Sequence, residues 1–210
     1  MQNTTIIPSI IAQNQEDLDH LLQKIGDHAH TLQLDVMDGQ FVPSRSLDFG
    51  FELPFEDYEW EAHLMIKDPS RWIQVHGEFV DTIIVHFESL HHPRERIDSI
   101  KSIGKRAGLA LNPETDLDQI KPYLNKLDQV LVMTVHPGYY GSSFLPETTK
   151  KIKELRRWEP QMDIEVDGGI KPETIGMVYQ AGANLFVSGS YLVHSDNFKE
   201  RMQVLRDSLR

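Results

Sequence analysis

The sequence predicts an α/β protein that forms one (β/α)₈ barrel, or TIM barrel, over residues 1–210. Three observations lead to this prediction. Short apolar segments rich in Ile and Val alternate with longer amphipathic segments. No linker or low-complexity tract divides the chain, which indicates a single domain. Polar and titratable residues gather where the apolar segments end, as at the mouth of such barrels.

Eight short apolar segments are the predicted strands. They are Thr5–Ile11, Leu32–Val36, Glu59–Met65, Thr82–Val85, Gly108–Leu111, Val130–Val135, Asp163–Val166 and Asn184–Ser188. Eight strand–helix units in about 200 residues suit a small barrel. A doubly wound open sheet is the alternative, but its first strand usually runs into a glycine-rich turn. Here that place holds Pro8-Ser9-Ile10-Ile11-Ala12, without glycine, which favours the barrel.

Amphipathic helices are predicted between the strands. Segments 17–25 and 147–158 carry apolar residues at steps of three and four. Several helical segments begin at or just after a proline, a position that tolerates this residue; these are Pro69, Pro113, Pro146 and Pro172. The second connection, residues 41–55, contains two prolines and looks irregular, so we expect a short helix there or none.

Composition excludes several classes of protein. The chain has no cysteine, which excludes disulfide scaffolds, iron–sulfur clusters and thiol nucleophiles. Its 21 basic and 32 acidic residues give a net charge of −11, which disfavours a nucleic-acid partner. No apolar run approaches the ~20 residues of a membrane span. The first eleven residues lack the features of a signal peptide, so we expect a soluble, cytoplasmic protein.

Two aspartates end strands that face each other across the predicted mouth. Asp35 or Asp167 alone would most simply be a turn or helix-cap residue. Together they could face the two sides of a small substrate, which suits removal of a proton from one face of a carbon and its return to the other. His63 alone would suggest a half-buried structural histidine. Beside two carboxylates it becomes a candidate ligand for Zn, Mn or Fe.

Glycines after the last two strands predict an anion site. Any one of Gly168, Gly169 and Gly189 could simply turn the chain, and Ser190 follows directly. However, backbone N–H groups after strands seven and eight form a recurring phosphate site in these barrels. A protein of net charge −11 repels anions at long range, so an anionic substrate would need such a local site.

Two further features belong to the predicted mouth. Residues 136–144 form a long segment with Gly138 and Gly141, which suggests a lid that excludes water, with an ordinary surface loop as the alternative. Met37, Met65 and Met133 each end a strand, and we expect them to pack together near the mouth.

A series of short motifs runs in order through nearly the whole chain. They are Pro8-Ser9-Ile10, Asp35-Val-Met-Asp-Gly39, Phe41-Val-Pro43, His63-Leu-Met65, Val85-His86, Ala110-Leu-Asn-Pro113, Val132-Met133-Thr134, Pro137-Gly138, Glu165-Val-Asp-Gly-Gly-Ile170 and Gly189-Ser190. Together they resemble the ribulose-phosphate 3-epimerase family. The motifs that begin at Asp35 and at Glu165 make the resemblance specific.

The resemblance implies a (β/α)₈ barrel that interconverts D-ribulose 5-phosphate and D-xylulose 5-phosphate. It implies that Asp35 and Asp167 are the acid/base pair, and that one divalent metal ion, held by these aspartates and two histidine positions, stabilises a cis-enediolate. The substrate would lie on Ser9, Met37, Met65 and Met133, with His63 and His86 nearby. Its phosphate would rest on Gly168, Gly169, Gly189, Ser190 and the lid residues Gly138 and Gly141.

The chain departs from the family pattern at three places. Gln33 stands at one metal-ligand histidine position, Tyr140 at a glycine position of the lid, and Ser44 where asparagine is usual. An amide oxygen is a weaker ligand than imidazole for Zn or Fe. We therefore expect Asp35, His63 and Asp167, with Gln33, to hold the metal more weakly. The alternative is that Gln33 donates its N–H to the enediolate and that no metal is needed.

Several functional alternatives stay open. The substrate could be a ketohexose phosphate such as allulose 6-phosphate, and a non-catalytic sugar-phosphate-binding homologue would belong to a different class. Retention of both aspartates disfavours the second, because binding alone needs no acid/base pair. Hexulose-phosphate synthases and decarboxylases are disfavoured because no lysine ends the second or third strand. The oligomeric state, including a homo-oligomer, is left open.

Overall fold

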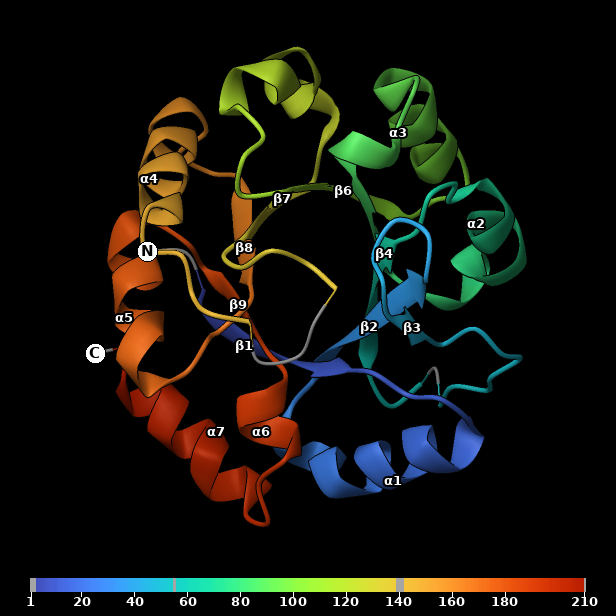
Figure 1. Ribbon diagram of the computed structural model, residues 1–210, viewed down its shortest axis with the longest axis vertical. Helices are drawn as coiled ribbons and strands as arrows, with labels where there is room; N and C mark the ends of the chain where they lie inside the picture. Colours follow the sequence, from blue (N-terminus) through green and yellow to red (C-terminus); the bar gives the residue numbers. More distant parts are fainter. Residues whose placement is uncertain (1–2, 55, 139–141, 210) are drawn as a thin grey trace.

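A closed barrel of eight parallel strands forms the centre of the computed structural model, which describes residues 3–54, 56–138 and 142–209. The strands are β1 (Thr5–Ile10), β2 (Thr31–Asp38), β4 (Glu59–Met65), β5 (Thr82–His86), β6 (Arg106–Leu111), β7 (Gln129–Met133), β8 (Asp163–Asp167) and β9 (Leu185–Ser188). They are hydrogen-bonded in the order β1-β9-β8-β7-β6-β5-β4-β2, and pairing of β1 with β2 closes the ring (Figure 1). The predicted (β/α)₈ barrel is confirmed.

Helices surround the strands on the outside of the barrel (Figure 1). They are α1 (Gln15–Ile25), α2 (Ser70–His76), α3 (Pro93–Ser102), α4 (Thr148–Trp158), α5 (Pro172–Ala181), α6 (Ser190–Val193) and α7 (Phe198–Asp207), with 3₁₀ helices η1 (Gly26–His28), η2 (Gly77–Phe79), η3 (Phe87–Ser89) and η4 (Leu117–Lys126). The helix expected after Pro113 is the 3₁₀ helix η4, which contains Pro122, a residue without the N–H that an α-helix needs. Within the described ranges, every helix is too short or too polar to cross a bilayer.

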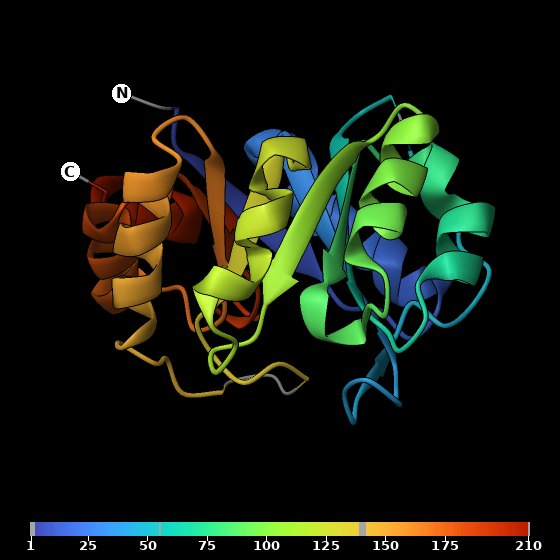
Figure 2. The ribbon, with the colours of Figure 1, turned by 90° about the horizontal axis from the view of Figure 1, so that it is seen from above.

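The connection from β2 to β4 contains no helix in residues 39–54 and 56–58. Instead a two-residue strand, β3 (Arg45–Ser46), pairs antiparallel with the end of β2. Ser46 is buried, and its hydroxyl accepts a hydrogen bond from the backbone N–H of Ala12 at 3.2 Å. This connection and the segment after β7 lie at one end of the barrel, opposite the chain termini (Figure 2). That end is the mouth.

The apolar core lies mainly between the strands and the helices. Residues such as Ile10, Leu34 and Phe186 point outward from the barrel into this layer and are fully buried. Successive strand residues face opposite sides, so their neighbours point into the barrel. A smaller apolar cluster occupies part of the interior, formed by Ile84, Ala110, Leu131, Met133 and Val135. Much of the remaining interior is polar.

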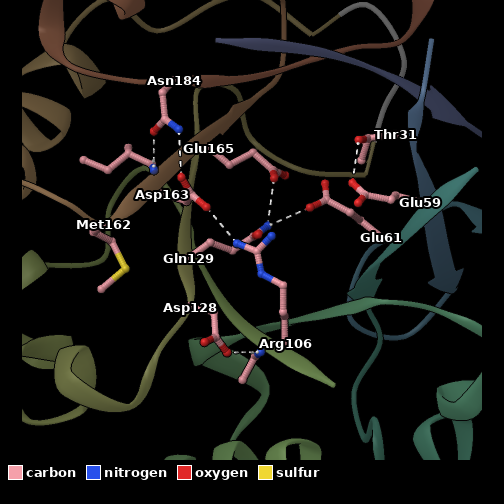
Figure 3. A network of polar contacts seen from close by, with 12 residues as sticks. Thr31, Glu59, Glu61, Arg106, Asp128, Gln129, Met162, Asp163, Glu165 and Asn184 are labelled. Carbon is pink, nitrogen blue, oxygen red and sulfur yellow. Dashed lines mark hydrogen bonds and ion pairs between the residues drawn. The ribbon is translucent and has the colours of Figure 1, made fainter. Parts of the chain in front are cut away.

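Three buried polar side chains, Glu61, Gln129 and Glu165, form the floor of the barrel, at the end opposite the mouth. Figure 3 shows these side chains and their hydrogen bonds. The amide of Gln129 donates to Glu165 Oε2 at 2.9 Å and to Glu61 Oε1 at 3.3 Å. Burial raises the pKa of Glu61 to about 7. Burial and the charge of Glu61 raise the pKa of Glu165 well above its ordinary value. Below the floor, Arg106 pairs with Asp163 at 2.7 Å.

Candidate active site

The register of neighbouring strands brings the candidate site together. Asp35 on β2 pairs directly with His63 on β4, and Asp167 ends β8 beside Met133 of β7. Gln33 lies two residues before Asp35 and therefore faces the same side of β2. Because the barrel is closed, these inward-facing side chains meet near its axis.

Asp35, His63 and Asp167 form one cluster. His63 Nδ1 lies 3.3 Å from Asp35 Oδ1 and 3.2 Å from Asp167 Oδ2. One potential ligand atom from each residue lies within 4.8 Å of the other two. Two carboxylate oxygens and one imidazole nitrogen form a donor set that suits Zn, Mn or Fe.

The amide nitrogen of Gln33 occupies the middle of this cluster. It donates to Asp35 Oδ1 at 2.8 Å and to Asp167 Oδ2 at 3.1 Å, and it lies 3.5 Å from His63 Nδ1. The amide oxygen of Gln33 is buried and has no hydrogen-bond partner among the described residues. Rotation of the amide by a half turn would bring this oxygen toward the three potential ligands. The residues present therefore fit a divalent cation.

The charges of the cluster shift the affinity of its members for protons. Burial lowers the pKa of His63, but hydrogen bonds and charges from Asp167 and Asp35 outweigh burial and raise the pKa to about 9. Burial, together with the charge of Asp167, raises the pKa of Asp35. Protons and a metal cation would thus compete for the same groups.

His86 lies beside His63, at the carboxyl end of β5, where its ring also packs against Phe41 of the β2–β4 connection. Its Nε2 atom is 2.9 Å from His63 Nε2, and its Nδ1 atom is 3.2 Å from Glu88 Oε2. Both imidazoles are fully buried. Burial lowers the pKa of His86 to about 4. His86 is not among the residues that line the cavity at the mouth, and its contact with the substrate stays a prediction.

A cavity of about 300 Å³ opens above the cluster at the mouth. Both predicted acid/base residues, Asp35 and Asp167, line it. Most of the predicted substrate-binding residues line it as well: Ser9, Met37, Met65, Met133, Gly138, Gly168, Gly169, Gly189 and Ser190. Met37 and Met65 pack together with Val42, whereas Met133 belongs to the interior apolar cluster, so the three methionines do not form one group as expected. The lid residues Tyr140 and Gly141 lie outside the described residues.

Several residues of the cavity wall were not predicted from the sequence, including Arg45, Lys171 and Tyr191, whereas Ser142 belongs to the predicted lid segment 136–144. Lys171 closely follows the glycine turn at Gly168 and Gly169, and a cationic residue there in an acidic chain was a usable signal. Arg45 lies in the irregular connection 41–55, where no local pattern indicated it. Ser44, noted as a departure from the family pattern, also lines the cavity and donates to the carbonyl of Gly138 at 2.5 Å. This bond joins the β2–β4 connection to the segment after β7.

Two glycines after β8 have backbone conformations that favour glycine. Gly168 has φ +116° and Gly169 has φ +65°, both in the left-handed region. A Cβ atom on Gly168 would lie 2.4 Å from Val135, and one on Gly169 would lie 3.1 Å from Phe144. Glycine here therefore lets the backbone approach both the wall of the cavity and the end of the segment after β7.

The fold and this site define a (β/α)₈ barrel with a carboxylate–imidazole centre below a glycine-bordered cavity. Such a combination at the strand ends is typical of a barrel enzyme. The sequence model of the ribulose-phosphate 3-epimerase family matches residues 5–193. The chain belongs to the ribulose-phosphate 3-epimerase family and is an isomerase.

Relatives from distant organisms support this membership. The chain is 34% identical to ribulose-phosphate 3-epimerase of Eremothecium gossypii, over 100% of this chain and 95% of that protein. It is 35% identical to ribulose-phosphate 3-epimerase of Bacillus subtilis, over 97% of this chain and 98% of that protein. The structure of 3-hexulose-6-phosphate synthase from Salmonella typhimurium superposes with a TM-score of 0.73 and 14% identity, covering 98% of each chain. This last likeness shows the fold alone.

Proposed function

We propose that the protein interconverts D-ribulose 5-phosphate and D-xylulose 5-phosphate by moving a proton at C3. One observation carries the proposal: two carboxylates, Asp35 and Asp167, line a cavity bordered by glycine turns and meet at the imidazole of His63. An epimerase that inverts one carbon needs two proton-carrying groups in one small site, and binding alone needs neither.

The two aspartates would share the proton transfers. One carboxylate takes the proton from C3, and the electron pair of the broken C–H bond moves into a cis-enediolate. The other carboxyl group then gives a proton to the opposite face of C3, which inverts the configuration. The raised pKa of Asp35, caused by burial and by the charge of Asp167, is the direction expected for a carboxyl group that carries a proton in catalysis.

Asp35, His63, Asp167 and the amide oxygen of Gln33 would hold one divalent ion, with Zn, Mn and Fe as candidates. When bound, the ion supplies positive charge that stabilises the negative enediolate oxygens. The neutral amide in place of an imidazole supports weaker retention of the ion than in relatives with histidine there. Gln33 would also need to break its two hydrogen bonds to the aspartates before its oxygen could turn inward.

The phosphate of the substrate would lie against the backbone of Gly168, Gly169, Gly189 and Ser190. The left-handed conformations of Gly168 and Gly169, and the place of all four residues in the cavity wall, support this assignment. Lys171 lines the same cavity and would add a positive charge close to the phosphate. A local site of this kind would offset the long-range repulsion from a protein of net charge −11.

Proton exchange and metal analysis together test the proposal. The purified protein is analysed for metal and then incubated with D-ribulose 5-phosphate in D₂O, with and without added Mn²⁺, Zn²⁺ or Fe²⁺. NMR should show D-xylulose 5-phosphate and deuterium at C3, with allulose 6-phosphate converted more slowly. Faster conversion of allulose 6-phosphate would move the assignment to the hexulose phosphate. Absence of exchange with either sugar under every metal would favour a non-catalytic binder.

A further inference from the structure

A chain of buried hydrogen bonds runs from His63 away from the cavity to Glu88. His63 Nε2 and His86 Nε2 are 2.9 Å apart, and His86 Nδ1 is 3.2 Å from Glu88 Oε2. The two ring planes are inclined by only 25°, with centroids 5.0 Å apart, so the rings meet edge to edge as this hydrogen bond requires. The other carboxylate oxygen of Glu88, Oε1, accepts the backbone N–H of Asn112 at 2.8 Å and the hydroxyl of Thr115. Glu88 is thus held at both oxygens.

The direction of each hydrogen bond follows from Glu88. An ionised carboxylate can only accept, and the two donors at Oε1 favour the ionised form. His86 must therefore carry its proton on Nδ1 and present a lone pair at Nε2. His63 must in turn donate from Nε2. The other ring nitrogen of His63, Nδ1, faces Asp35 and Asp167 and takes no part in the hydrogen bond to His86.

The loop that holds Glu88 is itself fixed from a distant element. Lys151 on α4 donates to the carbonyl oxygens of Asn112 at 2.9 Å, Pro113 at 3.1 Å and Thr115 at 2.6 Å. The two donors that bind Glu88 therefore belong to a segment with little freedom to reorient. The carboxylate keeps one orientation toward His86.

We propose that Glu88 is a positioning residue of the epimerase centre: through His86 it fixes His63 as an Nε2–H donor and reserves His63 Nδ1 for the cation held with Asp35 and Asp167. The inference rests on the proposed function, because it assigns the cation site of that function. Second partners of metal-bound histidines commonly set the tautomer in this way, and their loss typically costs 10–100-fold in metal affinity.

Glu88→Gln should reverse the chain of hydrogen bonds. The N–H of Asn112 and the hydroxyl of Thr115 would hold the new amide oxygen, so the amide NH₂ would face His86. His86 would then accept at Nδ1 and carry its proton on Nε2, and His63 would have to accept at Nε2. The remaining proton of His63 would sit on Nδ1, where it can still bond to Asp35 or Asp167 but opposes a cation. The metal-free fold would keep every bond.

Two measurements on the full chain test this. Nitrogen-15 NMR of the metal-free protein at neutral pH should find the His86 proton on Nδ1 in the wild type and on Nε2 in Glu88→Gln. Chelator competition should show Mn²⁺ and Zn²⁺ affinity falling about 10–100-fold in Glu88→Gln, with a nearly unchanged unfolding temperature of the metal-free protein. Glu114→Gln is the matched control, because Glu114 lies in the loop after β6 that contacts Glu88, but its own side chain is exposed and pairs with His136.

The outcomes separate this inference from the proposed function. A wild-type His86 proton on Nε2, or wild-type metal affinity in Glu88→Gln, would overturn the role of Glu88 whatever the enzyme does. The expected tautomer change and affinity loss in a protein that fails to exchange the C3 proton would support Glu88 and overturn the function instead. Should Glu88→Gln not fold, the wild-type tautomer alone decides.

Discussion

A single residue, Gln33, connects the three other members of the candidate site. Its amide nitrogen stands between Asp35, Asp167 and His63, where it links the two carboxylates by hydrogen bonds of 2.8 and 3.1 Å. The substitution was visible in the sequence because it falls inside a specific motif. Its hydrogen bond to Asp167 was not visible, because the two residues are 134 positions apart in the sequence. The neutral amide of Gln33 therefore bridges the two carboxylates by hydrogen bonds without compensating their charge.

Replacing Gln33 by histidine should tighten metal binding. Imidazole is a better ligand than an amide oxygen for Zn and Fe, and it does not have to break two amide hydrogen bonds. We expect about a tenfold or larger gain in affinity, equivalent to ~1.4 kcal/mol, by chelator competition. Gln203→His, on the exposed face of α7, is the control. Equal affinities for wild type and Gln33→His would show that position 33 is not a ligand.

Changing either aspartate to asparagine should remove turnover and largely spare binding. An amide cannot carry the C3 proton, so Asp35→Asn and Asp167→Asn should each lower kcat by ~10²–10⁴-fold. Deuterium incorporation at C3 measures this loss, and displacement of a fluorescent sugar phosphate measures binding. The exposed Asp118→Asn serves as control. If one of the two variants exchanged deuterium at the wild-type rate, its aspartate would not belong to the acid/base pair.

At the scale of elements, alternating apolar segments predicted all eight barrel strands. Their ends were less predictable: β2 extends to Asp38 because β3 pairs with Met37 and Asp38. A strand of two residues such as β3 has no periodic pattern, so it depends on contacts with other segments: its pairing with β2 and hydrogen bonds to Ala12 and Gln13. The 3₁₀ geometry of η4 was likewise missed, although Pro122 marks it.

The candidate site was predictable to the extent that its residues end strands. Asp35, His63 and Asp167 all do so, and the barrel places strand ends together. The link from His86 to Glu88 and the side chains of Arg45 and Lys171 were not predicted. Their positions follow from loop conformations and from hydrogen bonds between segments far apart in sequence, which local patterns do not encode.

The glycine turn after β8 should respond to a side chain at Gly169. Alanine there would meet Phe144 at 3.1 Å and would crowd the backbone where the phosphate is proposed to lie. We expect KM for the sugar phosphate to rise about tenfold, or ~1.4 kcal/mol. Gly104→Ala is the matched control, because Gly104 also has a positive φ of +77° but has nothing within 4 Å of the added Cβ. A similar KM in both variants would argue against this phosphate position.

At the scale of the whole molecule, the polar floor makes stability depend on pH. The pKa of Glu61 rises from 4.5 to about 7 on burial, so its folded form prefers the proton. This contribution to stability is complete below pH 4.5 and is lost as the pH rises through about 7. Ionisation above that range leaves a buried charge beside Glu165, which destabilises the closed barrel.

Glu61→Gln should therefore gain stability over the wild type as the pH rises. Because the glutamine cannot ionise, we expect its advantage in unfolding free energy to grow by about 1–3 kcal/mol between pH 5 and pH 8. Urea unfolding at the two pH values measures the change. Glu59→Gln, at the exposed start of the same strand, should show no such growth. Parallel pH profiles for wild type and Glu61→Gln would refute the role of the floor.

The pairing of β1 with both β9 and β2 also has a consequence for synthesis on the ribosome. Thr5 pairs with Leu185 and Ser9 pairs with Gln33. The first strand to be synthesised, β1, therefore cannot complete its hydrogen bonds until the last strand, β9, has emerged. Asp35 and His63 likewise leave the exit tunnel long before Asp167. A nascent chain thus carries an open sheet edge, which invites association with other chains. The proposed cation site is likewise incomplete until β8, which carries Asp167, has left the exit tunnel.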